Sequence, residues 1–273
     1  MKITGQTPYG EWLAAWVSVY KEPKLKPHST LTIRNCIRLH IPEEIKDSLL
    51  SELDPFELQR ALNAVRTSRL RLYVFDIYRE SLRRAAQLHY IPFSPAESLE
   101  RPLHVKENGK PLTKEELSVF LADIQNDRLK NLYLFYLYTG CRRSEALTVT
   151  WDDIDFERNT IYIRGTKNTG ARRVVPLFKE LRSVLSRLPH SPDGLLFHCS
   201  PEYATKSFKE LCPAHHLHDL RHTFATRCLE CGIAIKVVQK WLGHTQLNTT
   251  ASIYVHCMED YLAAEANKFR LIA

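Results

Sequence analysis

The sequence lacks the features of a membrane protein and of a secreted protein, and it also lacks one common phosphate-binding string. Its N-terminus has no apolar core of signal-peptide length, and no window approaches a membrane-spanning helix. The seven cysteines are scattered and odd in number, so we expect no disulfide framework. The phosphate-binding string Gly-x-x-x-x-Gly-Lys-Ser/Thr does not occur. A protein of the reducing cytoplasm is the simplest interpretation.

The composition is that of an ordinary globular protein with a basic balance. The 273 residues are enough for two domains with separate cores, and 44% of them are hydrophobic. The formal net charge of +7 favours a polyanionic partner without proving one. No internal repeat or low-complexity segment is visible in the sequence.

The N-terminal part, residues 1–91, predicts a unit of four helices. Apolar residues at helical spacing over 9–20 predict the first helix, and a second begins near residue 29. Asp54 followed by Pro55 combines an N-cap with a proline at the first helical position, which predicts the start of the third helix. The fourth helix is expected to be long, from about residue 68 to residue 90.

A run of arginines accompanies this fourth helix, with few acidic residues nearby. Guanidinium groups suit phosphate oxygens, which duplex DNA offers at close intervals. A solvated helix face is the alternative interpretation, and the sequence alone does not choose between the two. The residues expected to contact DNA are Arg66, Arg69, Arg71, Arg79, Arg83 and Arg84.

The composition changes after residue 91. Residues 92–112 hold four prolines, a glycine and mixed charges, which is typical of an interdomain linker. Thr113 and Glu116 form a capping box that opens a second domain, expected at 113–273. This domain is predicted to be mainly helical, with a largely apolar helix that stops at Gly140.

A small antiparallel sheet is predicted inside the second domain. Short β-branched runs at 160–163 and 174–175 flank a glycine-rich turn, as in a hairpin. Residues 194–197 are expected to add an edge strand. The fold class is therefore α+β: mainly α, with a small antiparallel sheet.

The stretch from residue 218 to residue 254 combines residue types that suit chemistry on a phosphate. His218 and Arg221 are three residues apart and share one face of a predicted helix. His244 follows a glycine that is expected to end a helix and to expose the imidazole. Tyr254 has apolar neighbours on both sides, so a packed core tyrosine is the alternative to a reactive phenol.

A zinc site is the main competing interpretation of the same stretch. His218 and His222 have the spacing of a metal-binding pair on a helix. Arg221 lies between them, and its fixed charge would repel a dication on the same face. The string from Cys228 to Cys231 is a further half-site, but no second string of that kind exists. We therefore expect no metal.

Two residues earlier in the domain each have an ordinary interpretation by themselves. Arg142 and Glu145 are three residues apart, as in a helical ion pair. Lys167 lies in the predicted hairpin turn, where a lysine usually serves solubility.

Taken together, these motifs closely resemble those of the tyrosine recombinase (phage integrase) family. The order His-x-x-Arg at 218–221, Leu-Gly-His at 242–244 and a tyrosine ten residues later matches the C-terminal motif of that family. The string Thr-Gly-Cys-Arg-Arg-Ser-Glu-Ala-Leu at 139–147 matches its first-arginine motif. The turn lysine followed by Val-Pro-Leu at 175–177 matches its β-hairpin. The resemblance of residues 1–91 to the core-binding domain of the family rests on pattern and placement.

The resemblance implies a mechanism without a metal or other cofactor. Tyr254 would attack a DNA phosphodiester, His218 would take the phenol proton, and Lys167 would protonate the leaving 5′ oxygen. The two arginines and His244 would stabilise the charge that grows on the phosphate, and Glu145 would support them. The product would be a 3′-phosphotyrosyl bond that can be religated without ATP. The implied catalytic residues are Arg142, Lys167, His218, Arg221, His244 and Tyr254.

The resemblance also implies partners. We expect double-stranded recombination sites, a homotetramer on DNA, and a directionality factor or DNA-bending protein as an accessory. Arg172 and Arg173 are expected to hold the DNA backbone. The tail at 258–273 is expected to form a helix that docks on its own domain or on a neighbouring protomer.

The biological role stays open at this point. Because the core-binding pattern begins near residue 9, we expect no additional arm-binding domain of the kind that many phage integrases carry. Integration or excision of a phage or other mobile element is the leading interpretation. The alternatives are a chromosome-dimer resolvase, a type IB topoisomerase-like nicking and resealing enzyme, and a non-catalytic DNA-binding regulator.

Overall fold

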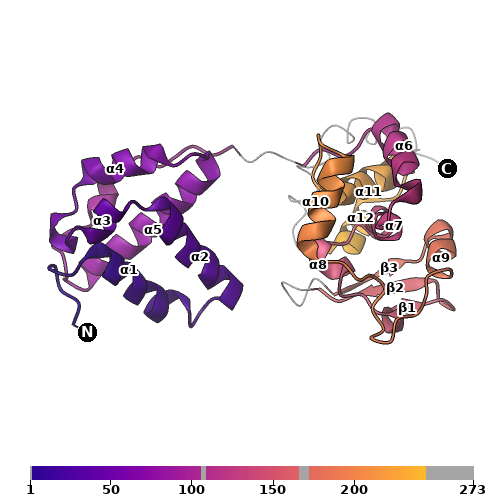
Figure 1. The fold of residues 1–273 in the computed structure, drawn as a ribbon, viewed down its shortest axis with the longest axis horizontal. Helices are drawn as coiled ribbons and strands as arrows, with labels where there is room; N and C mark the ends of the chain where they lie inside the picture. Colours follow the sequence, from indigo (N-terminus) through magenta and orange to yellow (C-terminus); the bar gives the residue numbers. More distant parts are fainter. Residues whose placement is uncertain (1, 106–108, 166–171, 244–273) are drawn as a thin grey trace, which may run out of the picture. The chain divides into compact units, whose positions relative to one another are not determined.

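The computed structural model describes residues 2–105, 109–165 and 172–243. The chain divides into two compact units, Met1–Lys106 and Glu107–Ala273 (Figure 1). The boundary between the units falls inside residues 92–112, the stretch that the sequence predicts as a linker. Each end of this stretch packs against one unit. Leu99 is buried in the core of the first unit, and Leu112 is buried in the core of the second.

The first unit is helical and contains the four helices expected from the sequence. The short α3 was not expected. Its helices are α1 (Tyr9–Trp16), α2 (Pro27–His40), α3 (Glu43–Asp47), α4 (Pro55–Ala64) and α5 (Ser68–Gln87). A π-helical turn at Val17–Lys21 and 3-10 turns at Leu50–Glu52 and Pro95–Ser98 complete it.

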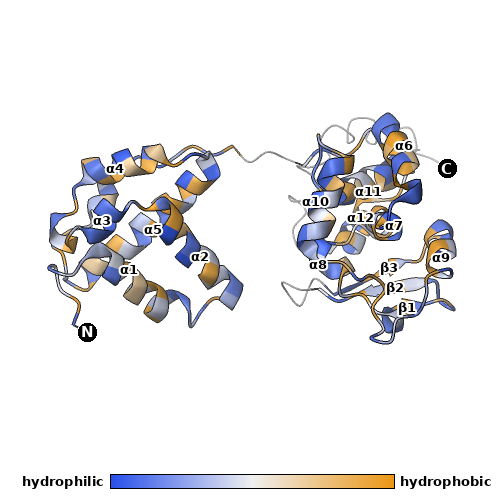
Figure 2. Cartoon of the chain, viewed as in Figure 1, coloured by the Kyte–Doolittle hydropathy of each residue, from blue (hydrophilic) through white to orange (hydrophobic). Residues whose placement is uncertain are grey.

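Local signals explain where these helices begin. The Asp54 carboxylate accepts a hydrogen bond from the Phe56 amide at 3.2 Å, as an N-cap should, and Pro55 follows it. Thr67 caps α5 through the Leu70 amide at 3.3 Å. Figure 2 shows hydrophobic and hydrophilic residues on α5, as expected for a helix with one buried side.

The second unit combines helices with a three-stranded sheet. Its helices are α6 (Lys114–Asp123), α7 (Lys130–Thr139), α8 (Arg143–Ala146), α9 (Lys179–Leu185), α10 (Pro201–Leu211), α11 (Asp219–Glu230) and α12 (Ile235–Leu242). Short 3-10 turns lie at Ile124–Asn126 and Trp151–Asp153. The strands are β1 (Ile154–Asp155), β2 (Thr160–Ile163) and β3 (Arg173–Pro176).

The sheet is antiparallel throughout, in the order β1-β2-β3, and Ile161 pairs with Val175 across the predicted hairpin. Figure 1 shows the sheet and α9 on one side of this unit, away from α6 and α10. The predicted capping box is present, because Thr113 and Glu116 satisfy each other's backbone amides.

The predicted edge strand at 194–197 is wrong. Leu195 makes only an isolated bridge with Thr150, while β1 supplies the third strand. The reason is packing: Phe197 turns into the core, where its ring lies edge-on to Phe135 at 5.3 Å between centroids. No helix in the described ranges is long and apolar enough to cross a membrane.

The end of α7 is where three helices of the second unit meet. Gly140 terminates α7 with a left-handed backbone (φ 59°). A Cβ on Gly140 would lie 2.4 Å from the Phe224 ring of α11 and 2.8 Å from Leu242 of α12. Only glycine satisfies both the backbone and the space at this position.

Replacing Gly140 by alanine should destabilise the protein more than a backbone effect can explain. Gly194 is the matched control, because it also has a positive φ of 74°, but nothing lies within 4 Å of the position that a Cβ would take there. We expect Gly194→Ala to lower the free energy of unfolding by about 1 kcal/mol. Gly140→Ala should lose about 1–3 kcal/mol more from overpacking. Urea unfolding of the full chain measures both, and equal losses would contradict the packing argument.

Candidate functional site

The Glu145 carboxylate is the centre of the predicted site. It is 1% exposed and lies in the first turn of α8. Its two oxygens accept from Arg142 Nη1 and from Arg173 Nη2, each at 2.8 Å, and a third bond at 2.8 Å comes from the Arg142 amide. The expected ion pair of Arg142 and Glu145 is therefore present, and it is part of a larger cluster.

The charge of Glu145 is maintained by its arginines. Burial by itself would raise the pKa of this carboxyl group, because it disfavours the ionised form. The hydrogen bonds and charges of Arg173 and Arg142 outweigh burial and lower the pKa to about 2. Glu145 is thus a carboxylate at any physiological pH.

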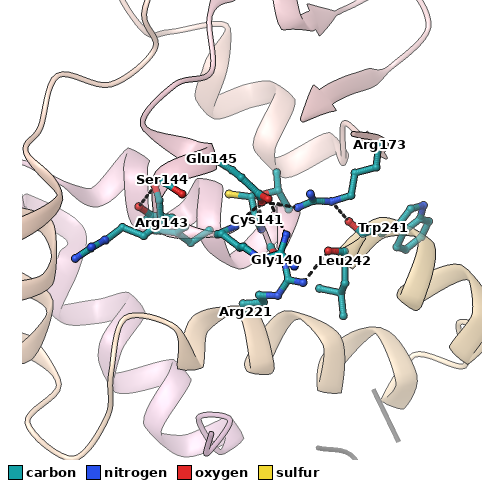
Figure 3. Close-up of polar contacts among 12 residues, drawn as sticks. Gly140, Cys141, Arg143, Ser144, Glu145, Arg173, Arg221, Trp241 and Leu242 are labelled. Carbon is teal, nitrogen blue, oxygen red and sulfur yellow. Dashed lines mark hydrogen bonds and ion pairs between the residues drawn. The ribbon is translucent and has the colours of Figure 1, made fainter. Parts of the chain in front are cut away.

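Arg221 connects the ends of two other helices to this cluster. It comes from α11 and is 3% exposed. Its Nη1 donates to the Gly140 carbonyl at 2.6 Å, and its Nη2 donates to the Leu242 carbonyl at 2.7 Å (Figure 3). Both carbonyls lie at helix C-termini, where a cation complements the helix dipole. Burial and then the charges of Arg142 and Arg173 lower the pKa of Arg221 to about 9, which leaves it charged at neutral pH.

Arg173 differs from its expected role at the DNA backbone. It is 6% exposed, and its guanidinium group donates to Glu145 and to the Trp241 carbonyl (Figure 3). A buried, paired side chain of this kind holds β3, α8 and α12 together. The alternation of β3 could have predicted this burial, because Arg173 and Val175 are two residues apart and therefore lie on the same, inner face of the strand. The neighbouring Arg172 is exposed.

His218 lies at the start of α11, three residues from Arg221. Its side chain keeps an exposed face in a cavity of about 280 Å³, which is also lined by Cys141, Arg143 and Thr205. Desolvation by the surrounding protein, followed by the charges of His222 and Arg221, lowers the pKa of His218 from 6.5 to about 4. The imidazole is therefore neutral, and able to accept a proton, at neutral pH.

Three of the predicted residues, Lys167, His244 and Tyr254, lie outside the described residues. Arg173, six residues after Lys167, belongs to the cluster. Gly243, which precedes His244, lies beside it, since a Cβ on Gly243 would lie 3.0 Å from the Arg173 side chain. As predicted, Gly243 ends α12 with a left-handed backbone.

Arg143 is separate from the cluster. Figure 3 shows its side chain directed away from Glu145. Its Nη1 donates to the Pro201 carbonyl at 3.2 Å and to the Thr205 hydroxyl at 2.8 Å. The zinc pair of the competing interpretation, His218 and His222, has ring centroids 5.0 Å apart. No group of three or more potential metal ligands occurs among the described residues.

Comparison with known proteins identifies the chain. Residues 110–260, more than half of its length, match the model of the phage integrase family. The chain belongs to the phage integrase family. It is a tyrosine recombinase, an enzyme that breaks and rejoins DNA at specific sites.

Relatives of the chain are named tyrosine recombinases. The recombinase is 34% identical over 200 residues to the tyrosine recombinase XerA of Thermococcus kodakarensis, across 65% of this chain and 68% of the relative. It is 31% identical over 192 residues to the tyrosine recombinase XerC of Chlamydia trachomatis serovar D, across 61% of this chain and 60% of the relative.

Solved structures share its fold. An integrase of the Tn1549 transposon in complex with circular intermediate DNA matches 95% of this chain and 99% of its own, with a TM-score of 0.76 and 21% identity. A lambda integrase tetramer bound to a Holliday junction matches 89% of this chain and 79% of its own, with a TM-score of 0.74 and 17% identity. The mainly helical fold with a small antiparallel sheet is thus that of the recombinases.

Some of the arginines of the first unit of the recombinase have partners on that unit. Arg71 donates to the Val65 carbonyl at 3.0 Å, and Arg83 donates to the Glu97 carboxylate at 3.0 and 3.1 Å. The Arg84 guanidinium lies 4.8 Å from the centre of the Tyr20 ring.

The other arginines of this run differ. Within the described ranges, no ion pair or side-chain hydrogen bond involves Arg66, Arg69 or Arg79, and the first two are exposed. Arg66 and Arg69 are thus the exposed members of the run that no side-chain contact in the described ranges holds in place.

Replacing Glu145 by glutamine should destabilise the recombinase at neutral pH by roughly 3 kcal/mol, because Arg173 is left buried without a counterion. The pKa of Glu145 is lower in the folded chain than its usual 4.5. Its contribution is therefore complete above pH 4.5 and is lost as the pH falls toward 2. Urea unfolding between pH 2 and 7 measures the free energy of unfolding of both proteins.

The free energies of the wild type and of Glu145→Gln should converge in acid. Glu202→Gln, an exposed control, should match the wild type throughout. A stability difference independent of pH would contradict the assigned charge.

Proposed function

We propose that this recombinase cleaves DNA by attack of the Tyr254 phenol on a phosphodiester, which forms a 3′-phosphotyrosyl bond. Arg142 and Arg221 bind the non-bridging oxygens of the phosphate, with His244 as a further donor. His218 accepts the phenol proton, and Lys167 protonates the departing 5′ oxygen. The bond energy is conserved, so rejoining to another strand needs no ATP.

The cluster around Glu145 is the observation that carries this proposal. Arg142 and Arg173 bind one buried carboxylate, and the charge of Arg221 acts on the same cluster, so positive charge remains in excess. Phosphoryl chemistry requires stabilisation of the negative charge that develops on the phosphate. Arg142 keeps 29% of its side chain exposed, which suits it to a ligand, whereas Arg173 is held inside.

The neutral imidazole of His218 supports the assignment of the general base. A base must be deprotonated at the working pH and lie within hydrogen-bond reach of the proton that it takes. The lowered pKa of His218 meets the first condition at neutral pH. The cationic surroundings that lower it would be partly neutralised by a bound phosphate.

We propose double-stranded recombination sites as the substrate and a homotetramer as the active assembly. The lambda integrase tetramer on a Holliday junction and the Tn1549 integrase with circular intermediate DNA support this, since both share the fold. Within this assembly, residues 1–91 serve as the DNA clamp, 92–112 as the linker and 113–273 as the catalytic domain. Directionality factors or DNA-bending proteins are proposed accessories.

Integration or excision of a mobile element is the leading biological role. The XerA and XerC relatives are named tyrosine recombinases and not integrases, which leaves a chromosome-dimer resolvase as a second candidate. Mapping the covalent adducts of the recombinase on its host genome distinguishes the two. Adducts at the two ends of an element indicate integration or excision, whereas adducts at one chromosomal site outside any element indicate resolution.

Tyr254→Phe should abolish the covalent DNA complex and leave DNA binding within about twofold of the wild type, because only the nucleophilic oxygen is removed. The assay uses a nicked suicide duplex that carries the site beside the gene, with adducts resolved on denaturing gels. Tyr261→Phe is the matched control and should form adducts normally.

An undiminished adduct with Tyr254→Phe would overturn the assignment of the nucleophile. Cleavage should also persist in excess chelator, because arginines compensate the charge. Activity that disappears in chelator and returns with zinc would favour the metal pair of His218 and His222. Relaxation of any supercoiled plasmid, without exchange between sites, would favour the topoisomerase-like alternative.

Replacing Arg66 and Arg69 together by alanine should flatten the dependence of the DNA association constant on salt. Each lost phosphate contact lowers the slope of log K against log salt by roughly one unit. Arg60→Ala is the control, because Arg60 is already paired with Glu57 on the surface of α4. Filter binding at several salt concentrations measures the slopes. An unchanged slope in the double variant would mean that this face is merely solvated.

A further inference from the structure

The segment at 109–112, at the beginning of the second unit, is hydrogen-bonded to α11, the helix that carries Arg221 and directly follows His218. The Leu112 amide donates to the Thr223 hydroxyl at 2.9 Å, and the Leu112 carbonyl accepts from Arg227 at 2.7 Å. Both partners belong to α11. Residues 109–112 therefore follow the surface of α11 through specific bonds.

A buried histidine secures the same segment at the beginning of α11. The His215 ring is 6% exposed, and its Nδ1 lies 3.2 Å from the Lys110 carbonyl. Its Nε2 lies 3.3 Å from a Glu116 carboxylate oxygen. Asp219, in the first turn of α11, accepts from the His216 amide at 2.8 Å. These contacts link the segment before α6 to the turn that holds His218.

Gly109 lies directly against the imidazole of His222. A Cβ on Gly109 would be 2.2 Å from Cδ2 and 2.3 Å from Nε2 of that ring, and 2.9 Å from an Asp219 oxygen. Gly109 is not among the glycines with positive φ, so its backbone would tolerate any residue. Space, and not backbone conformation, requires glycine here.

His222 in turn lies against His218. The two rings are T-shaped, with centroids 5.0 Å apart and planes at 85°. His222 is 7% exposed, whereas His218 keeps an open face in its cavity. A shift of His222 therefore has a direct route to His218, one helical turn earlier.

We propose that His222 is a positioning residue for His218, and that the backbone at Gly109 holds His222 in place. The path of the chain at the beginning of the second unit thereby sets the orientation of the general base. This inference rests on the proposed role of His218. A base must lie about 2.6–3.2 Å from the proton that it abstracts. A misplacement of about 1 Å at an active site can slow the reaction about 100-fold.

Gly109→Ala is the first test, because its methyl group forces the His222 ring to move. Single-turnover cleavage of the suicide duplex, at saturating protein, should slow about 100-fold. DNA affinity should stay within about twofold of the wild type. Leu103→Ala, at a side chain that is 92% exposed in the same stretch, is the control and should cleave like the wild type.

Removing the His222 ring separates positioning from general damage. His222→Ala should slow cleavage by itself. Adding Gly109→Ala in this background should cause a much smaller fold loss than in the wild type, because the clash with the His222 ring is gone and only the 2.9 Å contact with an Asp219 oxygen remains. Equal fold losses from Gly109→Ala in both backgrounds would overturn the proposal. So would a normal rate for the single Gly109→Ala variant.

A spectroscopic readout covers the case in which Gly109→Ala fails to fold. His222→Ala should raise the titration midpoint of His218, followed by NMR of its imidazole. The reason is that His222 makes the largest electrostatic contribution among those that lower the pKa of His218. A folded His222→Ala protein with an unchanged His218 signal and an unchanged rate would overturn the proposal.

His218→Gln distinguishes this inference from the proposed function. If His218→Gln cleaves at the wild-type rate, the assignment of the general base fails. If His218→Gln is slow while Gly109→Ala is fast, the general base stands and only the positioning role fails. In the His218→Gln background, Gly109→Ala should have no added effect.

Discussion

The buried carboxylate of Glu145 is the interaction on which the site depends. A charge that is removed from water requires partners, because the cost of desolvation is otherwise several kcal/mol or more. Glu145 obtains them from Arg142 beside it in the chain and from Arg173 on β3. The same carboxylate that starts α8 therefore also anchors the sheet. Arg173 extends the connection to the end of α12 through the Trp241 carbonyl.

The arrangement also brings like charges together before any substrate arrives. Arg221 and Arg142 would repel each other, yet Arg221 is held by carbonyls at the ends of α7 and α12. Helix C-termini carry partial negative charge, which offsets the repulsion. The fold thus holds these cations in position, which would require little reorganisation in the phosphate chemistry proposed for them.

Sequence patterns predicted the features that depend on neighbours in the chain. The capping box of Thr113 and Glu116, the N-cap at Asp54 and the end of α7 at Gly140 all follow from residues within one helical turn. The pairing of β2 and β3 was predicted for the same reason, since the two strands are close in the sequence. The strand predicted at 194–197 was wrong, because Leu195 makes only a single bridge and Phe197 packs into the core, a contact with a distant part of the chain.

The order and spacing of the motifs in the sequence were sufficient to indicate the family, without any knowledge of the fold. Most helices were also predicted from the sequence, since their periodicity and caps are local. The burial of Arg173 against Glu145 and the contact between Gly109 and His222 were visible only in the folded chain. These contacts join residues 28 and more than 100 positions apart in the chain. A local sequence pattern does not specify such long-range contacts, because they result from the packing of whole helices and strands.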